Sequence, residues 1–317
     1  MKIDTQSLVA RAMDSCKRFY HGIYCLVAIF SSVLLPTALT FAQANQLVVA
    51  KVASSPVIDG VADDAAWRGA QPLKLDVRRV MPPNKGVRIE ASIRAAYSLT
   101  YVYFLLSWKD PTADVSHKTW TWNAATGAYE EGKDREDMAA LAFELNGPFT
   151  ADMLSPVEAT WDVWHWKAFR TNPQGYAMDK THRYFRQQPD TKANKHEAND
   201  GSEIWITRPE DSGDSVEKKQ GAPTRNEGER VQQYLPGTPS GSAADVGAKG
   251  KWADGWWTVE FARKLDTGEA DDTTFSPDRC YRMAVATFDR TGDMDKASEL
   301  IVLRLDGAKA VECPASQ

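Results

Sequence analysis

The sequence predicts an all-β fold, organised as a single β-sandwich with a long polar insertion and a few short helices. From Gln46 onward, short runs rich in aromatic and β-branched residues alternate with polar turns, which is the pattern of consecutive β-strands. Some runs, such as 101–106, are apolar throughout and indicate strands buried on both faces. About eight to ten strands in one domain, residues 45–317, are consistent with a sandwich.

The expected elements follow in chain order. A turn at Asp59-Gly60 and a short helical segment deliver Trp67 to the interior. Two strands separated by Tyr97 and Ser98 form a hairpin. Strands are expected at 87–96, 99–108, 138–145, 256–263, 281–288 and 300–305.

Two polar segments interrupt this series. Residues 110–133 predict a loop that folds back onto the body, with Trp120 and Trp122 as its large apolar groups. Residues 171–246 are rich in charged residues, Gly and Pro, and are expected to form a long polar insertion. A structureless insertion of this length inside a domain is often a lid or a binding loop.

The first 44 residues have the organisation of a signal peptide. Lys17 and Arg18 precede an apolar run that ends in Ala42-Gln43-Ala44, a small-x-small cleavage pattern. An uncleaved membrane anchor is the alternative, because the run is nearly long enough to span a bilayer. Pro36 within the run favours cleavage after Ala44. The folded part is therefore expected in the periplasm, with no membrane segment after signal cleavage.

Charge and cysteine content narrow the class of protein further. After the first 44 positions are removed, 34 basic and 41 acidic residues remain, so nucleic acid is not an expected partner. Cys280 and Cys313 are then the two remaining cysteines, and in an oxidising compartment they predict one disulfide. The absence of a Cys-x-x-Cys-His motif excludes covalent c-type haem attachment.

The stretch 153–170 carries the main functional signal. As a strand it places Trp161, Val163 and His165 on one face and Trp164 and Trp166 on the other, so both faces are aromatic. A thioether lies shortly upstream at Met153, and sulfur beside aromatic groups suits a haem pocket. The alternative is that the tryptophans form sandwich core. His165 is likewise either a metal or haem ligand or a hydrogen-bonded core residue.

No pattern in the chain indicates catalysis, so no catalytic residue is assigned. The sequence lacks a Gly-x-Ser-x-Gly elbow, a His-Glu-x-x-His motif, a phosphate-binding loop and a dinucleotide fingerprint. Asp134, Glu136 and Asp137 form an acidic cluster, which a solvated strand end explains. The residues therefore give no indication of an enzyme in its own right.

Four segments, spread over nearly the whole chain after the signal, carry a family resemblance. The chain resembles the haem-binding family that includes the gamma subunits of ethylbenzene dehydrogenase and dimethylsulfide dehydrogenase, with related cytochrome c-552-like proteins. Sugar-binding and immunoglobulin-like sandwich modules have a similar architecture, and the former share the first segment. The four segments are Ile58-Asp-Gly60 with Asp63-Asp-Ala-Ala-Trp67, the strand 137–143, Trp161-Asp-Val-Trp-His-Trp-Lys-Ala-Phe-Arg170 with Asn172-Pro173, and Gly250 to Leu265.

The resemblance implies a non-covalent haem b at one end of the sandwich, with a methionine and a lysine as axial ligands. Met153 lies where the family places its methionine, and Lys249 or Lys251 lies just before the Gly-Trp strand, with Lys249 preferred. A lysine binds iron only as the neutral amine, which the small and apolar neighbours Ala248, Gly250 and Trp252 favour. Met153 and Lys249 are thus the expected iron ligands. The full expected haem-binding set is Met153, Lys249, Lys251, Trp161, Trp164, His165 and Trp166.

The family further implies redox partner proteins, among them molybdopterin and iron–sulfur subunits of a dehydrogenase complex. The chain departs from some relatives, which carry Cys-x-x-Cys-His before the Trp-rich strand, and its insertion at 171–246 is highly charged. The functional hypothesis is a periplasmic b-type cytochrome domain that relays single electrons. The alternatives are a haem-free carbohydrate- or ligand-binding sandwich module, and a structural subunit without cofactor.

Overall fold

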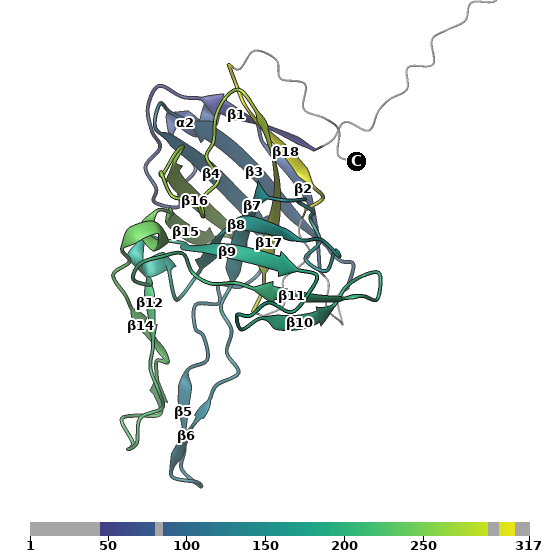
Figure 1. The fold of residues 1–317 in the computed structure, drawn as a ribbon. Coiled ribbons are helices and arrows are strands. Elements are labelled where there is room, and N and C mark those ends of the chain that lie inside the picture. Colours follow the sequence, from purple (N-terminus) through teal and green to yellow (C-terminus); the bar gives the residue numbers. More distant parts are fainter. Residues whose placement is uncertain (1–44, 80–84, 291–297, 308–317) are drawn as a thin grey trace, which may run out of the picture. The chain divides into compact units, whose positions relative to one another are not determined.

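A computed structural model describes residues 45–79, 85–290 and 298–307 (Figure 1). All of these residues belong to one compact unit, residues 42–317. The expected signal peptide, residues 1–44, and Cys313 lie outside the described residues. Within the described part, no helix is both long and apolar enough to cross a membrane.

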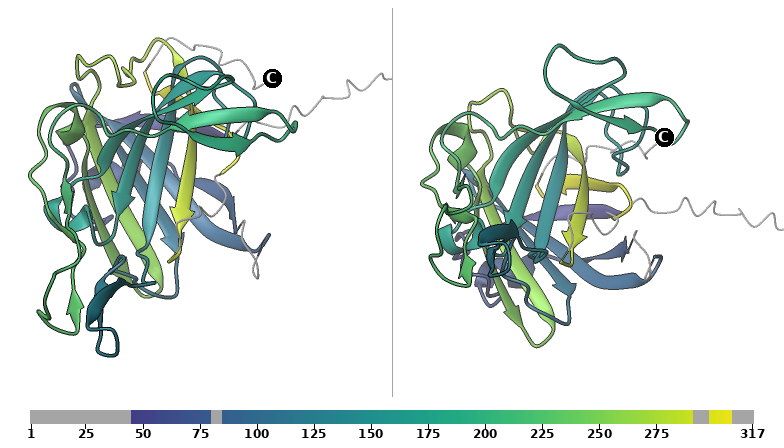
Figure 2. Two further views of the ribbon diagram at one scale, coloured as in Figure 1. Left: turned by 60° about the horizontal axis from the view of Figure 1, so that its bottom comes forward. Right: turned by 90° about the horizontal axis from the view of Figure 1, so that it is seen from below.

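One continuous 13-stranded sheet folds over to form both layers of a β-sandwich (Figures 1 and 2). We call its two parts the β8 layer and the β16 layer. The β8 layer runs β10 (Asn194–Glu197), β11 (Glu203–Thr207), β9 (Met178–Phe185), β8 (Ala159–Lys167), β7 (Met138–Asn146), β17 (Cys280–Phe288) and β18 (Ile301–Leu305). The β16 layer runs β3 (Arg88–Tyr97), β4 (Tyr101–Lys109), β16 (Trp256–Lys264) and β15 (Gly247–Ala253), and β2 (Leu73–Arg78) pairs with β3.

Strand β1 (Gln46–Lys51) joins the two layers. Its first residues pair in parallel with β18, and Ala50 and Lys51 pair in parallel with β3. At the opposite edge the backbone of the segment before β9 meets β15, because Ala177 donates to Val246 and Ala248 donates to Gly175. The layers are thus connected by backbone hydrogen bonds along both edges.

The core between the layers is strongly aromatic. Phe143 on β7 and Trp164 on β8 lie 4.8 Å apart between ring centroids, and Phe104 on β4 lies 5.4 Å from Phe143. All three rings are fully buried. Burial of rings of this size from both layers supplies most of the apolar area that holds a sandwich together.

The predicted fold class is confirmed, and the expected strands are present within two residues of their predicted limits. The hairpin at 88–109 forms as expected, with β3 and β4 antiparallel. Trp67 lies in a short helix, α2 (Ala65–Gly69), and is completely buried.

The polar segments contain more structure than predicted. Residues 178–207 supply three strands of the β8 layer, so this part of 171–246 belongs to the sandwich. Two small sheets contain further strands, beyond the predicted number. The polar segment 171–246 also contains two 3-10 helices, η1 (Asn172–Gln174) and η2 (Gly241–Ala244). These sheets are β13 (Arg230–Val231) with β5 (Trp120–Asn123) and β6 (Ala128–Glu131), and β12 (Glu217–Lys219) with β14 (Tyr234–Pro236).

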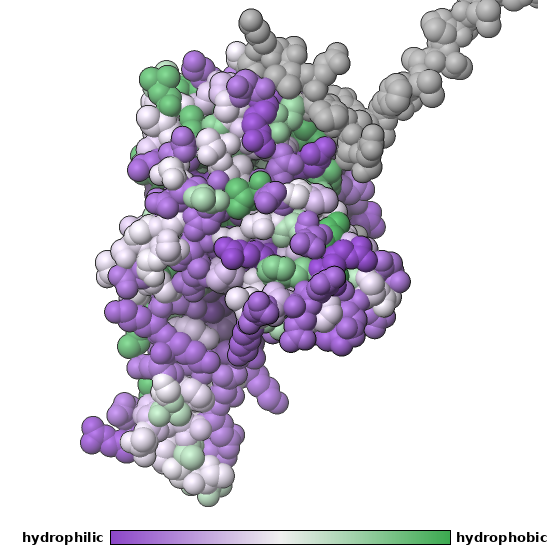
Figure 3. Space-filling model, in the orientation of Figure 1, coloured by the Kyte–Doolittle hydropathy of each residue, from purple (hydrophilic) through white to green (hydrophobic). Residues whose placement is uncertain are grey.

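The hairpins β5–β6 and β12–β14 extend away from the sandwich on the same side (Figure 1). The face drawn in Figure 3 is mainly hydrophilic, with hydrophobic residues scattered over it. A broad apolar contact surface is therefore absent from this face of the described chain.

Candidate functional site

A cavity lies on the outer face of the β8 layer. The space free of protein atoms is about 540 Å³, part of it open to solvent. The lining is predominantly apolar and comes from four neighbouring strands and the loop that precedes β8. It consists of Ala140, Ala142, Thr150, Ala151, Met153, Trp161, Val163, His165, His182, Tyr184, Ala284, Val285, Ala286 and Phe288.

Strand alternation explains why this face is hollow. Ala140 and Ala142 lie on β7, and Ala284 and Ala286 lie opposite or close to them on β17. Side chains two residues apart point to the same face, so these alanines form a low, flat floor next to the taller aromatic groups of β8 and β9. Alanine has little intrinsic preference for strands, so four of them at this spacing require a local reason. Their small side chains leave the space that forms the cavity.

His165 combines a position on the cavity with an unsatisfied ring nitrogen. Its Nε2 atom is buried and has no hydrogen-bond partner. Burial, followed by the positive charges of Lys167 and Lys180, lowers the pKa of His165 well below its usual value. The ring is therefore neutral at physiological pH, which is the form that binds a metal.

Met153 lies in the loop that covers part of the cavity. It packs against the apolar cluster that contains Trp161 and Tyr184, whose rings are tilted against each other with centroids 4.1 Å apart. The loop is fixed to the turn between β10 and β11, because Asn199 donates its backbone N–H to the Leu154 carbonyl and its Nδ2 to Asp152. Met153 thus approaches the cavity from a loop, whereas His165 approaches it from the sheet.

A second histidine, His182 on β9, also lines the cavity. Burial and the nearby Arg208 lower its pKa well below the usual value, so it is neutral as well. His182 pairs in register with Trp161, and His165 pairs with Met178, four positions along the strands. At about 3.3 Å per residue, the backbones of the two histidines are more than 13 Å apart. His165 and His182 therefore occupy different parts of the cavity lining.

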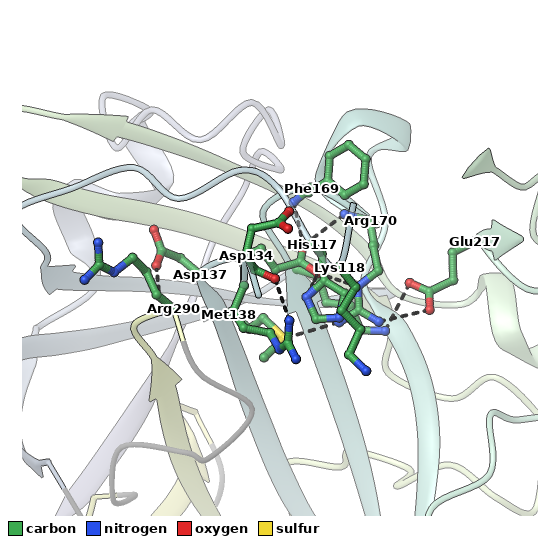
Figure 4. Close-up of polar contacts among 12 residues, drawn as sticks. His117, Lys118, Asp134, Asp137, Met138, Phe169, Arg170, Glu217 and Arg290 are labelled. Carbon is green, nitrogen blue, oxygen red and sulfur yellow. Dashed lines mark hydrogen bonds and ion pairs between the residues drawn. The ribbon is translucent and has the colours of Figure 1, made fainter. Parts of the chain in front are cut away.

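A buried ionic network borders the cavity beyond His165. Glu136 is fully buried and accepts hydrogen bonds from the backbone N–H of Phe169 and Arg170 and from the Arg170 guanidinium. Glu217 pairs with Arg170 at 3.2 Å (Figure 4). It also pairs with Lys167 at 3.1 Å. Burial and the neighbouring Arg170 lower the pKa of Lys167 to about 8. Lys167 also contacts the Met178 sulfur.

The structure brings together three of the seven residues predicted to bind the cofactor. Met153, Trp161 and His165 line one cavity. Trp164 and Trp166 do not, because their side chains point to the opposite face of β8 and belong to the core between the layers. The sequence had placed aromatic groups on both faces, but it could not show which face bordered the cavity.

Lys249 and Lys251 do not reach this cavity. Both lie on β15 in the β16 layer, where the Lys249 Nζ atom donates to the Asn172 carbonyl at 2.9 Å and Lys251 is exposed. Among the described residues, none of those that line the cavity is a lysine. Lys249 therefore does not line the cavity that Met153 borders, because it lies on β15 in the β16 layer.

Sequence reasoning missed His182, Tyr184, Phe288 and the four alanines of the floor. The alanines offered a signal, since Ala140 with Ala142 and Ala284 with Ala286 show a period of two within predicted strands. His182 gave none, because it lay in the segment that was expected to be an insertion.

Comparison with known proteins adds a family assignment. Among solved structures, a carbohydrate-binding module of family 9 from Caldicellulosiruptor kristjanssonii in complex with glucose matches with a TM-score of 0.37 and 11% identity, over 85% of this chain and 100% of the other. A putative carbohydrate-binding protein from Bacteroides uniformis matches with a TM-score of 0.42 and 10% identity, over 83% of this chain and 100% of the other. No curated protein matches. The family model described as ethylbenzene dehydrogenase matches residues 64–297, so the chain belongs to the ethylbenzene dehydrogenase family.

Proposed function

We propose that this protein is an electron-transfer protein that binds a non-covalent haem b in the cavity of the β8 layer, with His165 and Met153 as the axial ligands. The observation that carries the proposal is the buried, unpartnered Nε2 of a neutral histidine on an apolar cavity that a methionine borders from its covering loop. The family supports a role in a dehydrogenase complex.

The lining residues suit a haem in shape and chemistry. The alanine floor offers a flat apolar surface to a planar ring, and Trp161, Tyr184 and Phe288 supply aromatic contacts. Histidine and methionine are an established pair of axial ligands for electron-transfer haems.

The protein's own groups perform three tasks in this proposal. Burial keeps His165 neutral, so no proton competes for its ring nitrogen. The apolar lining excludes water, which disfavours the more highly charged oxidation state and tunes the potential. The Asn199 hydrogen bonds hold the loop of Met153 in place. When bound, the haem supplies one-electron chemistry, and redox subunits with molybdopterin or iron–sulfur centres are the proposed partners in the periplasm.

Ligand replacement tests the proposal directly. Apo protein would be reconstituted with haemin, and the ferric spectrum of the wild type compared with those of His165→Ala and Met153→Ala. Each variant should open one axial position and convert the low-spin spectrum to a high-spin one that reacts with carbon monoxide after reduction. Lys249→Ala and His196→Ala are matched controls outside the cavity and should leave the spectrum unchanged.

The alternatives give different outcomes in the same series. Loss of the low-spin spectrum in Lys249→Ala but not in His165→Ala would establish the methionine–lysine pair that the family resemblance implies. Loss of the low-spin spectrum in His182→Ala instead would identify His182 on β9, rather than His165 on β8, as the histidine ligand. Either result would contradict the assignment of His165.

A further inference from the structure

Arg263 of β16 is completely buried, and it forms an ion pair with two carboxylates inside the sandwich. Its Nη1 atom lies 2.7 Å from Asp162 Oδ2 and 2.7 Å from Asp272 Oδ1, while Nη2 donates to the Thr273 carbonyl. The guanidinium also stacks over the Trp164 ring, 4.7 Å from its centroid. Arg263 thus satisfies one oxygen of each carboxylate.

A third carboxylate, Asp179 of β9, faces the same cluster without a hydrogen-bond partner. Asp179 is 0% exposed, both of its carboxylate oxygens are unpartnered, and Oδ2 lies 3.7 Å from Arg263 Nη1. The second oxygens of Asp162 and Asp272 are unpartnered as well. An unpaired buried carboxylate is costly, so an arrangement with several free oxygens requires a compensating positive group.

The charges of the cluster are compatible with a bound divalent cation. Asp162, Asp179 and Asp272 in their ionised form exceed the single charge of Arg263 by two, and a divalent cation would neutralise the remainder. One carboxylate oxygen from each aspartate lies within 4.8 Å of the others. Two oxygens bound to the same Ca²⁺ at about 2.4 Å can be no more than about 4.8 Å apart, so the three carboxylates meet the spacing limit for sharing one ion.

We infer that Asp162, Asp179 and Asp272 form a buried divalent-cation site, selective for Ca²⁺, between the two layers of the sandwich. Ca²⁺ fits better than Mg²⁺, because it accepts irregular sets of carboxylate oxygens, whereas Mg²⁺ retains several waters in a strict octahedron. Zn²⁺ is disfavoured, because the cluster has neither histidine nor cysteine. The ion would join β8 and β9 to the segment after β16, and its role would be structural.

A further buried carboxylate lies beside the cluster. Asp211 adds a further carboxylate beside the cluster, where its Oδ1 accepts from Thr181 and its Oδ2 is unpartnered. Protons are the competing occupants of carboxylates that are buried this deeply. Thr181, Arg183 and Asp271, which are close to the cluster along the chain, line a surface cleft.

Terbium luminescence and thermal unfolding test the site on the full chain. Tb³⁺ replaces Ca²⁺ at oxygen-rich sites, and excitation of the nearby Trp164 should sensitise it. We expect about one Ca²⁺ per chain by elemental analysis, a Tb³⁺ signal that Ca²⁺ competes away, and an unfolding midpoint roughly 5 °C higher in Ca²⁺ than in chelator. Mg²⁺ at the same concentration should give a smaller shift.

Asp179→Asn keeps the size of the side chain and removes its charge, so it should reduce the Tb³⁺ signal at least tenfold and abolish the Ca²⁺-dependent shift. Asp272→Asn serves the same purpose if Asp179→Asn does not fold. The control is Asp110→Asn in the separate acidic cluster Asp110, Asp137 and Asp289, and it should retain both effects.

Two results would overturn the inference. In the first, the wild-type protein binds neither Ca²⁺ nor Tb³⁺, and Asp179→Asn unfolds at a higher temperature than the wild type. This result would mean that protons alone neutralise Asp179. The second is loss of binding in Asp110→Asn but not in Asp179→Asn, which would place the ion in the other cluster.

Discussion

Glu260 of β16 accepts a 2.6 Å hydrogen bond from Trp67 Nε1, and this contact connects two of the sequence segments that carry the family resemblance. The other carboxylate oxygen accepts the backbone N–H groups of Asp59 and Gly60, at 2.9 and 2.8 Å. The Asp59-Gly60 turn, Trp67 and the strand after Gly250 are therefore one structural unit around a buried carboxylate. These motif residues serve the fold of the β16 layer, away from the candidate cofactor cavity.

Glu260→Gln should destabilise the fold by about 2 kcal/mol, because an amide cannot accept all three hydrogen bonds that a carboxylate accepts. Urea-induced unfolding, followed by tryptophan fluorescence, measures this difference. Glu90→Gln is the control, since Glu90 is largely exposed and pairs only with Lys109 on the surface. Its effect should be within about 0.5 kcal/mol. Equal effects of the two substitutions would contradict the importance of the Glu260 contacts.

Gly250→Ala should also destabilise the protein, by about 1–3 kcal/mol, because a methyl group there has no room. An added Cβ would lie 2.9 Å from Val259 Cγ2 and would overlap the Trp166 ring. Trp166 cannot move freely, since its Nε1 donates to Asn172 Oδ1. Gly221→Ala, at a position with no atom within 4 Å, is the matched control and should be nearly neutral. Similar unfolding midpoints for the two variants would refute the close contact.

The pH dependence of stability should carry a contribution from His117. Its Nδ1 lies 3.4 Å from Glu136, but burial, followed by the charges of Arg170 and Arg135, outweighs the carboxylate and lowers the pKa of His117 to about 3. The unfolded chain, with a pKa of about 6.5, binds the extra proton first, so stability is lost as the pH falls below about 6.5. Between pH 7 and pH 5 this loss amounts to roughly 1–2 kcal/mol.

His117→Gln removes this contribution, so the variant should lose less stability than the wild type between pH 7 and pH 5. Denaturant unfolding of both proteins at both pH values gives the comparison, and other titrating groups cancel in the difference. An equal or greater loss in the variant would show that His117 is protonated in the folded protein.

The sequence was sufficient to predict the fold class and the main strands, because hydrophobic period and turn residues are local signals. It also singled out the stretch that contains Met153 and His165, and both residues line the cavity of the β8 layer. It did not separate the two faces of β8, and so Trp164 and Trp166 were assigned to the cofactor although they pack into the core. Which face borders a cavity depends on the small residues of β7 and β17, which are neighbours only in the folded sheet.

The charged segment 171–246 shows a second limit. Met178, Lys180 and His182 alternate on the outer face of β9, but Asp179 and Thr181 face inward and are buried with polar partners or ionic neighbours. Because the inward positions of β9 carry polar residues, its sequence does not alternate between apolar and polar residues. The sequence of this strand therefore resembled that of a loop. The contact of Arg263 with Asp162 likewise joins residues that are 101 positions apart, which no local pattern records.

The predicted disulfide of Cys280 with Cys313 has its own test. Cys280 is disulfide-bonded at the start of β17, whereas the predicted partner Cys313 lies outside the described residues. Peptide mapping without reduction should detect the cross-linked pair. Replacing both cysteines with serine should lower stability by roughly 2–4 kcal/mol. Two alkylatable thiols in the native protein would contradict the prediction.

The absorption spectrum of the full-length protein, purified after haem-replete periplasmic expression, tests the central claim most directly. The proposal predicts a strong Soret band, a sharp α band on reduction, about one haem per chain, and release of the haem into acidified organic solvent because no thioether bond holds it. A protein that is folded by circular dichroism but shows no Soret band, and takes up no haemin at micromolar concentration, would contradict haem binding in the β8-layer cavity.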